Sequence, residues 1–491
     1  MNSTSKFINL NKTQSMWLLH IMLSVIVFIN PVSALNILLV LVASVYFNYK
    51  KQYANVLITG LYAVCAKSES VFFVYAISVS AMVLFSKKKY ELNRVSKVFL
   101  GSIRLISIYL IFIYILQLFD EKSILSLPMF LITFATSISV VFFILKNEIS
   151  ELDKEYVLAN LFCIAFVQAT IALVFQGVPT GIIKILNRPT LGDVVMGTTN
   201  SPNALSFIML ATAIPYLIST YKNWNLSKLL PFTCTAFFYL FIFILNDSKT
   251  TLACFVVAMS FTLGLTFWLN LLNPLHKIIT LCICFIVVIT SSFYFDSFVE
   301  QLQDKYEDYI SGKYNAKYRY YSTALSSETR PNLYYWLGTG AGTNGSRAGN
   351  ALAYDVMYKK QNTFALPKSV PAKSNAYTRK YLSTYYTKEY AEASAERSAV
   401  LGNPFNSFCA IFVEFGVIGT CIFIASQLVL IVLLVQKGAI LDVTATILII
   451  SNFLIGFLDQ SYERPSQAFT MYLMLGLAMA NIKPNKPQKS I

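Results

Sequence analysis

The chain has 491 residues, of which 56% are apolar and 13% charged, and it carries a formal net charge of +15. Soluble proteins average about 45–50% apolar and about 25% charged residues. So few charged groups cannot cover a water-facing surface, which argues against an ordinary soluble enzyme. An aromatic content of 15% also argues against a disordered chain. We therefore predict an all-α polytopic integral membrane protein.

Apolar runs separated by short polar joints predict about 14 transmembrane helices, within a range of 12–14. No cleavable signal pattern precedes the first run. The eight cysteines all lie in apolar stretches, so we interpret them as small apolar side chains and not as a disulfide or metal framework. The runs fall at roughly 15–30, 34–47, 53–66, 71–85, 98–118, 126–145, 156–176, 204–220, 229–245, 252–270, 278–294, 405–435, 445–458 and 466–481.

The positions of these runs predict three parts. Residues 1–294 form an N-terminal bundle of about 11 helices, residues 295–403 form one large loop domain, and residues 404–491 add about three helices. When the joints alternate with the N-terminus inside, the inside set holds 18 Lys and Arg and the short outside joints hold 6. Cytoplasmic joints collect positive charge. Both termini are therefore predicted to be cytoplasmic and the large loop extracytoplasmic.

The large loop is too long to be structureless, so we expect a mainly helical domain that is kept for function. It holds 15 of the 30 tyrosines, with 14 Lys and Arg against 10 Asp and Glu. Tyrosine rings suit stacking on sugars, and cationic side chains suit phosphate. An interfacial tyrosine belt and a solvated charged face explain the same composition equally well.

Four segments on the predicted outer side stand out. Residues 187–205 contain Arg188 and then GTTNSPNAL, where Asn200, Ser201 and Asn203 are able to cap a helix. The joint NDSKT at 246–250 places Lys249 at the membrane surface. Residues 317–350 combine a helix predicted from Arg319 to Arg330 with a Gly-rich run whose glycines permit close approach to an anion or substrate. Residues 403–420 re-enter the membrane and place a carboxylate, Glu414, at its edge, where charge is costly and is kept for function or pairing.

The order of these segments resembles the family of O-antigen ligases and Wzy-type polysaccharide polymerases. GTTNSPNAL is similar to the family's Gly-Thr-x-x-Asn-Pro-Asn-Ala segment, and NDSKT to its Ser-Arg joint, with Lys249 in place of Arg. YRYYSTAL followed by LGTGAG resembles its Arg-initiated helix and Gly-x-Gly-x-Gly run. NSFCAIFVEFGVIG resembles its Asn entry and Glu-x-Gly-x-x-Gly motif. The resemblance covers about residues 185–435, and the first half of the chain is compatible by hydropathy alone.

The resemblance implies a GT-C-like glycosyltransferase in the bacterial inner membrane, with the loop in the periplasm. It implies metal-independent, inverting transfer from an undecaprenyl-diphosphate-linked oligosaccharide to a second such oligosaccharide, with no cofactor and no nucleic acid. A chain-length regulator protein would be a further partner. Arg188, Lys249 and Arg319 match the family's cationic positions and are expected to neutralise the departing diphosphate. The residues expected to contact substrate are Asn203, Arg330, Gly338, Gly340, Arg347 and Asn406.

The chain departs from the family pattern at Phe405, where members usually carry a histidine. The only histidines, His20 and His276, fall in the first span and at a predicted cytoplasmic joint. Either a carboxylate such as Glu414 or Glu463 then serves as general base, or clamping of the leaving group suffices. This departure favours a repeat-unit polymerase. The alternatives are an O-antigen ligase or protein O-oligosaccharyltransferase, and a flippase or transporter of the lipid-linked oligosaccharide.

Overall fold

A computed structural model of the chain describes its helical segments with the gaps between them. The described residues are 33–66, 68–90, 92–116, 124–147, 149–187, 194–199, 201–222, 226–246, 248–268, 316–326, 332–343, 346–352, 374, 376–389, 407–457 and 461–480. Within these ranges the chain is helical and contains no strand, in agreement with the predicted all-α class.

Helices occupy twelve of the predicted apolar runs, and the other two runs, 15–30 and 278–294, lie outside the described residues. Four helical segments are long and apolar enough to cross a membrane: Arg94–Leu116, Ser126–Lys146, Glu151–Thr180 and Ser407–Lys437. Shorter apolar helices account for further runs. The fold is therefore that of a helical membrane protein, and the total of 14 spans stays a prediction. The predicted boundaries of the three parts are likewise untested.

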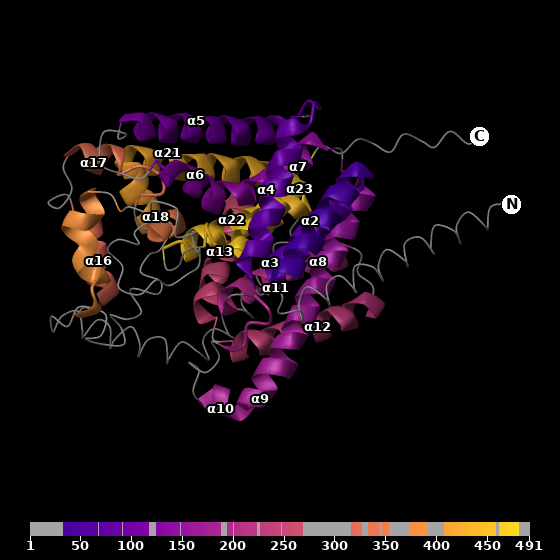
Figure 1. The fold of residues 1–491 in the computed structure, drawn as a ribbon. Coiled ribbons are helices and arrows are strands. Elements are labelled where there is room, and N and C mark those ends of the chain that lie inside the picture. Colours follow the sequence, from indigo (N-terminus) through magenta and orange to yellow (C-terminus); the bar gives the residue numbers. More distant parts are fainter. Residues whose placement is uncertain are drawn as a thin grey trace. The chain divides into compact units, whose positions relative to one another are not determined.

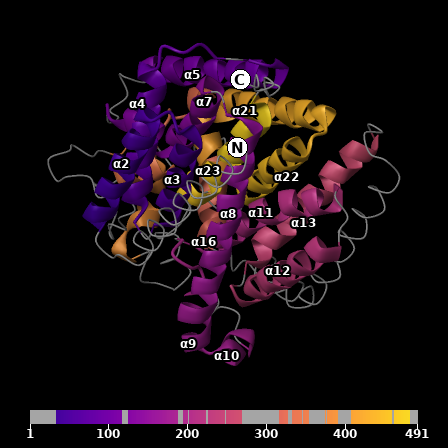
Figure 2. The same cartoon turned by 90° about the vertical axis from the view of Figure 1, so that its right-hand side faces the viewer.

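The chain divides into two compact units, and the first comprises residues 1–89, 139–248 and 482–491. Its centre is α3 (Tyr53–Cys65), which is buried along nearly its whole length and packs against α2, α4 and α8. A helix that is apolar on every side belongs inside a bundle. Figure 2 shows α2, α3 and α4 side by side. The remaining helices of this unit are α2 (Ser33–Tyr49), α4 (Glu69–Phe85), α7 (Ser139–Lys146), α8 (Glu151–Ile171), α9 (Val178–Thr180), α10 (Ile182–Asn187), α11 (Pro202–Lys222) and α12 (Leu226–Leu245), with a π-helical turn η3 (Ala172–Gly177) after α8.

The second unit comprises residues 90–138 and 249–481. Its most buried helix is α23 (Pro465–Met479), which packs against α22 (Ile440–Ile455). Figure 1 shows α5 (Arg94–Leu116) running alongside α21 (Ser407–Lys437), and the two are in contact. The other elements of this unit are α6 (Ser126–Phe130), η1 (Leu131–Ala135), η2 (Thr136–Ile138), α13 (Lys249–Trp268), α16 (Ala316–Leu325), α17 (Asn332–Leu337), α18 (Arg347–Leu352), η6 (Thr378–Leu382) and η7 (Ser383–Tyr386).

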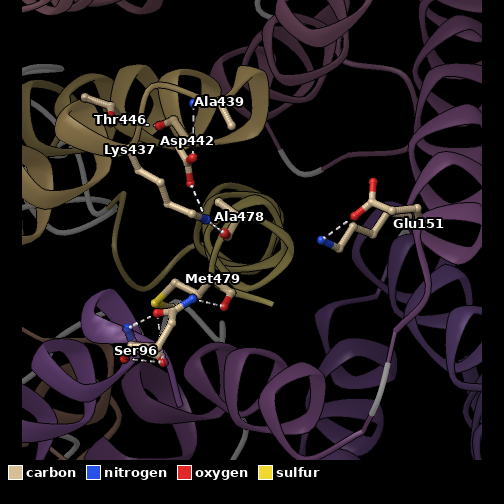
Figure 3. Close-up of polar contacts among 10 residues, drawn as sticks. Ser96, Glu151, Lys437, Ala439, Asp442, Thr446, Ala478 and Met479 are labelled. Atoms are coloured by element: carbon tan, nitrogen blue, oxygen red, sulfur yellow. Dashed lines mark hydrogen bonds and ion pairs between the residues drawn. The ribbon is translucent and has the colours of Figure 1, made fainter. Parts of the chain in front are cut away.

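An ion pair between a partly exposed lysine and a buried carboxylate connects three helix ends of the second unit (Figure 3). Lys437 Nζ, at the end of α21, lies 3.1 Å from Asp442 Oδ1 and donates to the carbonyl of Ala478 in α23 at 2.7 Å. Asp442 is 0% exposed and also accepts from the Ala439 amide at 3.2 Å, which caps α22. A charge buried at this depth requires such a partner set. The three helices are therefore held in register at this end.

Candidate functional site

The predicted span at 405–435 is interrupted, because α21 breaks at Gly416. That residue has φ 65° and ψ −173°, a conformation that only glycine adopts readily. A break of this kind removes the helical donors from the carbonyls of the preceding turn. Glu414 lies in that turn, so the carboxylate predicted at the membrane edge sits where the helix main chain is open to outside partners.

The Gly-rich segment, residues 338–343, supplies the missing donors from its own main chain. The amide of Thr339 donates to the carbonyl of Val413 at 2.9 Å, and the amide of Gly340 donates to the carbonyl of Glu414 at 2.9 Å. From α5, the hydroxyl of Tyr109 donates to the carbonyl of Phe415 at 2.7 Å. The carbonyls of Val413, Glu414 and Phe415, the three residues before the break, are therefore satisfied inside the second unit.

This docking requires glycine on both sides. Gly338 has φ +85°, and a Cβ there would lie 2.2 Å from the carbonyl oxygen of Glu414. A Cβ on Gly416 would lie 2.4 Å from the amide nitrogen of Gly338. The sequence predicts glycines that permit close approach, and the group that approaches is the main chain of α21. The amides of Gly338 and Gly340 both have internal acceptors, since Gly338 donates to Tyr334 at 2.9 Å.

The Glu414 side chain binds Gly342 and Ser346, which lie farther along the chain than the residues of the main-chain joint. It is 1% exposed. Its carboxylate accepts from the amide of Gly342 at 2.8 Å, and from Ser346 through the amide at 3.3 Å and the hydroxyl at 2.5 Å. Ser346 Oγ also accepts from the amide of Gly349 at 3.0 Å, so Ser346 is the N-cap of α18. The carboxylate of Glu414 thus fixes where α18 begins.

A second buried carboxylate, Glu463, holds the next residue of the loop. The amide of Arg347 donates to both of its oxygens at 3.0 and 2.9 Å, and the Arg347 guanidinium donates to its main-chain carbonyl at 3.0 Å. Thr133 Oγ1 lies 3.5 Å from the same carboxylate. Burial raises the pKa of Glu463 to about 7, against the opposing pull of the Arg347 amide and charge. The neighbouring residues Ser346 and Arg347 therefore bind two different carboxylates, that of Glu414 in α21 and that of Glu463 in the turn before α23.

The helix that carries Arg319 belongs to the same assembly. α16 packs against α21 and against the π-helical turn η6. Thr323 Oγ1 lies 2.7 Å from the Tyr385 hydroxyl, and the rings of Tyr320 and Tyr385 pack edge to face at 5.4 Å. The predicted helix Arg319–Arg330 instead begins at Ala316 and ends at Leu325. Lys249 opens α13, which packs against α21 and α22.

The remaining predicted segment, GTTNSPNAL, lies in the first unit and is fixed by two glutamines. Gln176 Oε1 accepts from the amides of Met196 and Gly197 at 2.8 and 2.9 Å. Gln168 Oε1 accepts from the amide of Thr198 at 2.8 Å. The predicted capping role is confirmed for Ser201, whose hydroxyl accepts from the Ala204 amide at 3.1 Å. Asn203 is half-buried in the first turn of α11.

Several predicted residues fall outside what the structure describes. Arg188, Asn200, Arg330, Asn406 and both histidines lie in the gaps, and the side chains of Lys249 and Arg319 are likewise outside the described part. Among the described residues, no three His, Cys, Asp or Glu side chains gather as metal ligands would. The six cysteines in the described ranges are not joined in disulfides.

Sequence reasoning missed three residues that organise this site. The sequence interpretation includes Gly416 only as part of a motif, although a glycine two residues after a membrane-edge carboxylate is a signal for a helix break. Ser346 precedes a short helical stretch in the N-cap position. Tyr109 lies in an apolar span, and nothing in its sequence context indicates a contact with residues more than 200 positions away.

A comparison of the chain with protein-family models, curated proteins and solved structures gives no match. The function is therefore argued from the residues and contacts described above.

Proposed function

We propose that the chain is a membrane glycosyltransferase that joins lipid-diphosphate-linked oligosaccharide repeat units into a longer polysaccharide. One observation carries the proposal: LGTGAG docks through its main chain onto the break in VEFGVIG, with the helix that bears Arg319 packed on the same α21. These segments are distant in sequence, and together they resemble the polymerase and ligase family. Their contact is what a shared site would require.

The proposed reaction requires a site at which the diphosphate leaves the donor sugar. An acceptor sugar hydroxyl attacks the anomeric carbon of the donor, the bond from that carbon to the diphosphate oxygen breaks with inversion, and the hydroxyl proton leaves for a base or water. The developing negative charge requires fixed cations. We assign this role to Arg319 and Lys249, which lie on α16 and at the start of α13. The resemblance adds Arg188, which lies outside the described residues.

Glu414 fits a positioning role better than that of general base. Its carboxylate is almost fully buried and already accepts three hydrogen bonds from the loop that it holds. A base must instead be within reach of the proton that it removes. We propose that Glu414 acts through the Gly-rich segment, by fixing the loop that follows the Arg319 helix.

Complementation of a deletion strain tests the proposal. In this strain the wild-type chain should restore a ladder of long glycans, and Arg319→Ala should restore only single repeats, because removing one fixed charge costs about 10²–10³-fold in rate. Lys388→Ala, which removes an exposed cation in the same predicted loop, is the control and should keep the ladder. Membrane insertion is checked by fractionation. A full ladder with Arg319→Ala would refute the cationic role, and a deletion strain that lacks even single capped repeats would indicate a ligase.

A further inference from the structure

A cluster of exposed lysines in the first unit lies outside the proposed transferase machinery. Lys50 and Lys51 follow α2, and Lys87, Lys88 and Lys89 follow α4; all five are exposed. We refer to these five residues as the lysine cluster. The two groups adjoin, because Lys88 Nζ contacts the hydroxyl of Tyr53, the first residue of α3, at 2.9 Å.

The helices themselves do not use these ammonium groups as caps. The end of α2 is closed by its main chain, with Lys50 donating to Tyr46 at 2.9 Å and Lys51 to Asn48 at 3.0 Å through their amides. The end of α4 is capped by a lysine from another helix: Lys146 Nζ donates to the carbonyls of Val83 at 2.6 Å and Ser86 at 3.0 Å. The ammonium groups of the cluster are therefore not needed as helix caps, and all five side chains are exposed.

Nearby acidic residues do not neutralise the cluster. Across the described ranges, no carboxylate forms an ion pair with any of its five lysines. At the start of α8, Glu151 pairs with Lys154 at 2.9 Å, and Asp153 accepts from the amide of Ser150 at 3.2 Å as part of the helix cap. Among the described residues, the positive charge of the cluster therefore has no carboxylate partner.

Exposed apolar side chains adjoin the lysine cluster at both helix ends, and we refer to Tyr49, Leu84 and Phe85 as the apolar collar. Tyr49 is 79% exposed, Leu84 79% and Phe85 85%, and each immediately precedes the lysines of its helix end or lies within three residues of them. Lys50 Nζ lies 5.7 Å from the centroid of the Tyr49 ring. Exposed aromatic and aliphatic side chains below lysines are typical of the boundary between acyl chains and headgroups.

We propose that the lysine cluster binds the headgroups of anionic phospholipids, with the collar of Tyr49, Leu84 and Phe85 lying against their acyl chains. Lys88 is the fixed element of this site, since it is held by Tyr53 and by Asn147 Oδ1 at 3.5 Å. The other four lysines have no carboxylate partner among the described residues, and their ammonium groups bind the phosphate. This inference rests on the membrane location of the chain and is independent of its proposed transferase activity.

Native mass spectrometry of the full chain in mixed phosphatidylglycerol and phosphatidylcholine tests this site. A lysine near an anionic surface contributes about fivefold in binding. Lys50→Gln/Lys51→Gln and Lys87→Gln/Lys89→Gln should therefore each weaken phosphatidylglycerol binding about 25-fold and leave phosphatidylcholine binding unchanged. Lys184→Gln/Lys388→Gln removes the same charge at exposed sites elsewhere and should have little effect. Equal loss in this control, or wild-type retention of phosphatidylglycerol in both cluster variants, would overturn the proposal.

Discussion

The main-chain joint between the Gly-rich segment and α21 makes a sharp prediction for Gly416→Ala. A Cβ at this position would lie 2.4 Å from the amide nitrogen of Gly338 and 2.5 Å from the carbonyl oxygen of Trp336. Both are main-chain atoms, so relief requires the segment to withdraw. Withdrawal breaks the Thr339 and Gly340 hydrogen bonds, at about 1 kcal/mol each. Backbone strain for alanine at this φ adds about 1–3 kcal/mol.

Gly438→Ala is the matched control, because Gly438 also has positive φ, +69°, but its added Cβ would meet only the carbonyl of Val435 at 3.9 Å. It should therefore show backbone strain alone, about 1–2 kcal/mol. We expect Gly416→Ala to lower the free energy of unfolding by about 2–3 kcal/mol more than Gly438→Ala. Denaturant unfolding of the purified variants in one detergent, followed by circular dichroism, measures the difference. Equal destabilisation by the two variants would show that the joint contributes no binding energy.

Two further predictions concern the side chains around the joint. The folded pKa of Glu463, about 7, lies above its ordinary value of 4.5, so the folded state favours the protonated form. The free energy of unfolding should therefore be greatest below about pH 4.5 and fall as the pH rises to about 7. Glu463→Gln should abolish this slope when unfolding is measured against pH. Tyr109→Phe removes the hydroxyl that donates to Phe415 at 2.7 Å and contacts Leu337 at 3.0 Å, and it should lower the free energy of unfolding by about 1–2 kcal/mol; an unchanged value would mean that water satisfies these carbonyls.

The helices of this protein are largely predictable from sequence because each one has to be apolar to be buried or to face lipid. The runs at 53–66 and 466–481 are found as α3 and α23, two of the most buried helices. Hydropathy does not report what happens within a run. The prediction of an unbroken span at 405–435 misses the break at Gly416, because one glycine barely changes the average over such a window.

The site is less predictable because its contacts join main-chain groups. The sequence indicates that LGTGAG and VEFGVIG belong together only through their order, and it assigns the glycines to a ligand. The structure shows the amides of Gly340 and Gly342 donating to Glu414 of α21, and the amide of Gly338 donating to Tyr334. Arg347 is expected at the substrate, yet its amide and guanidinium both contact Glu463. A pairing between residues more than 100 positions apart leaves no local pattern to read.

A joint built from peptide groups has a consequence for how such a protein diverges. The contact between residues 338–340 and 413–416 depends on glycine at Gly338 and Gly416 and on main-chain donors and acceptors, with one further bond from Thr339 Oγ1 to the Val413 carbonyl at 3.2 Å. The main-chain hydrogen bonds do not depend on which other side chains the two segments carry. We therefore expect chains that share this joint to keep the two glycines and their spacing while most surrounding residues differ.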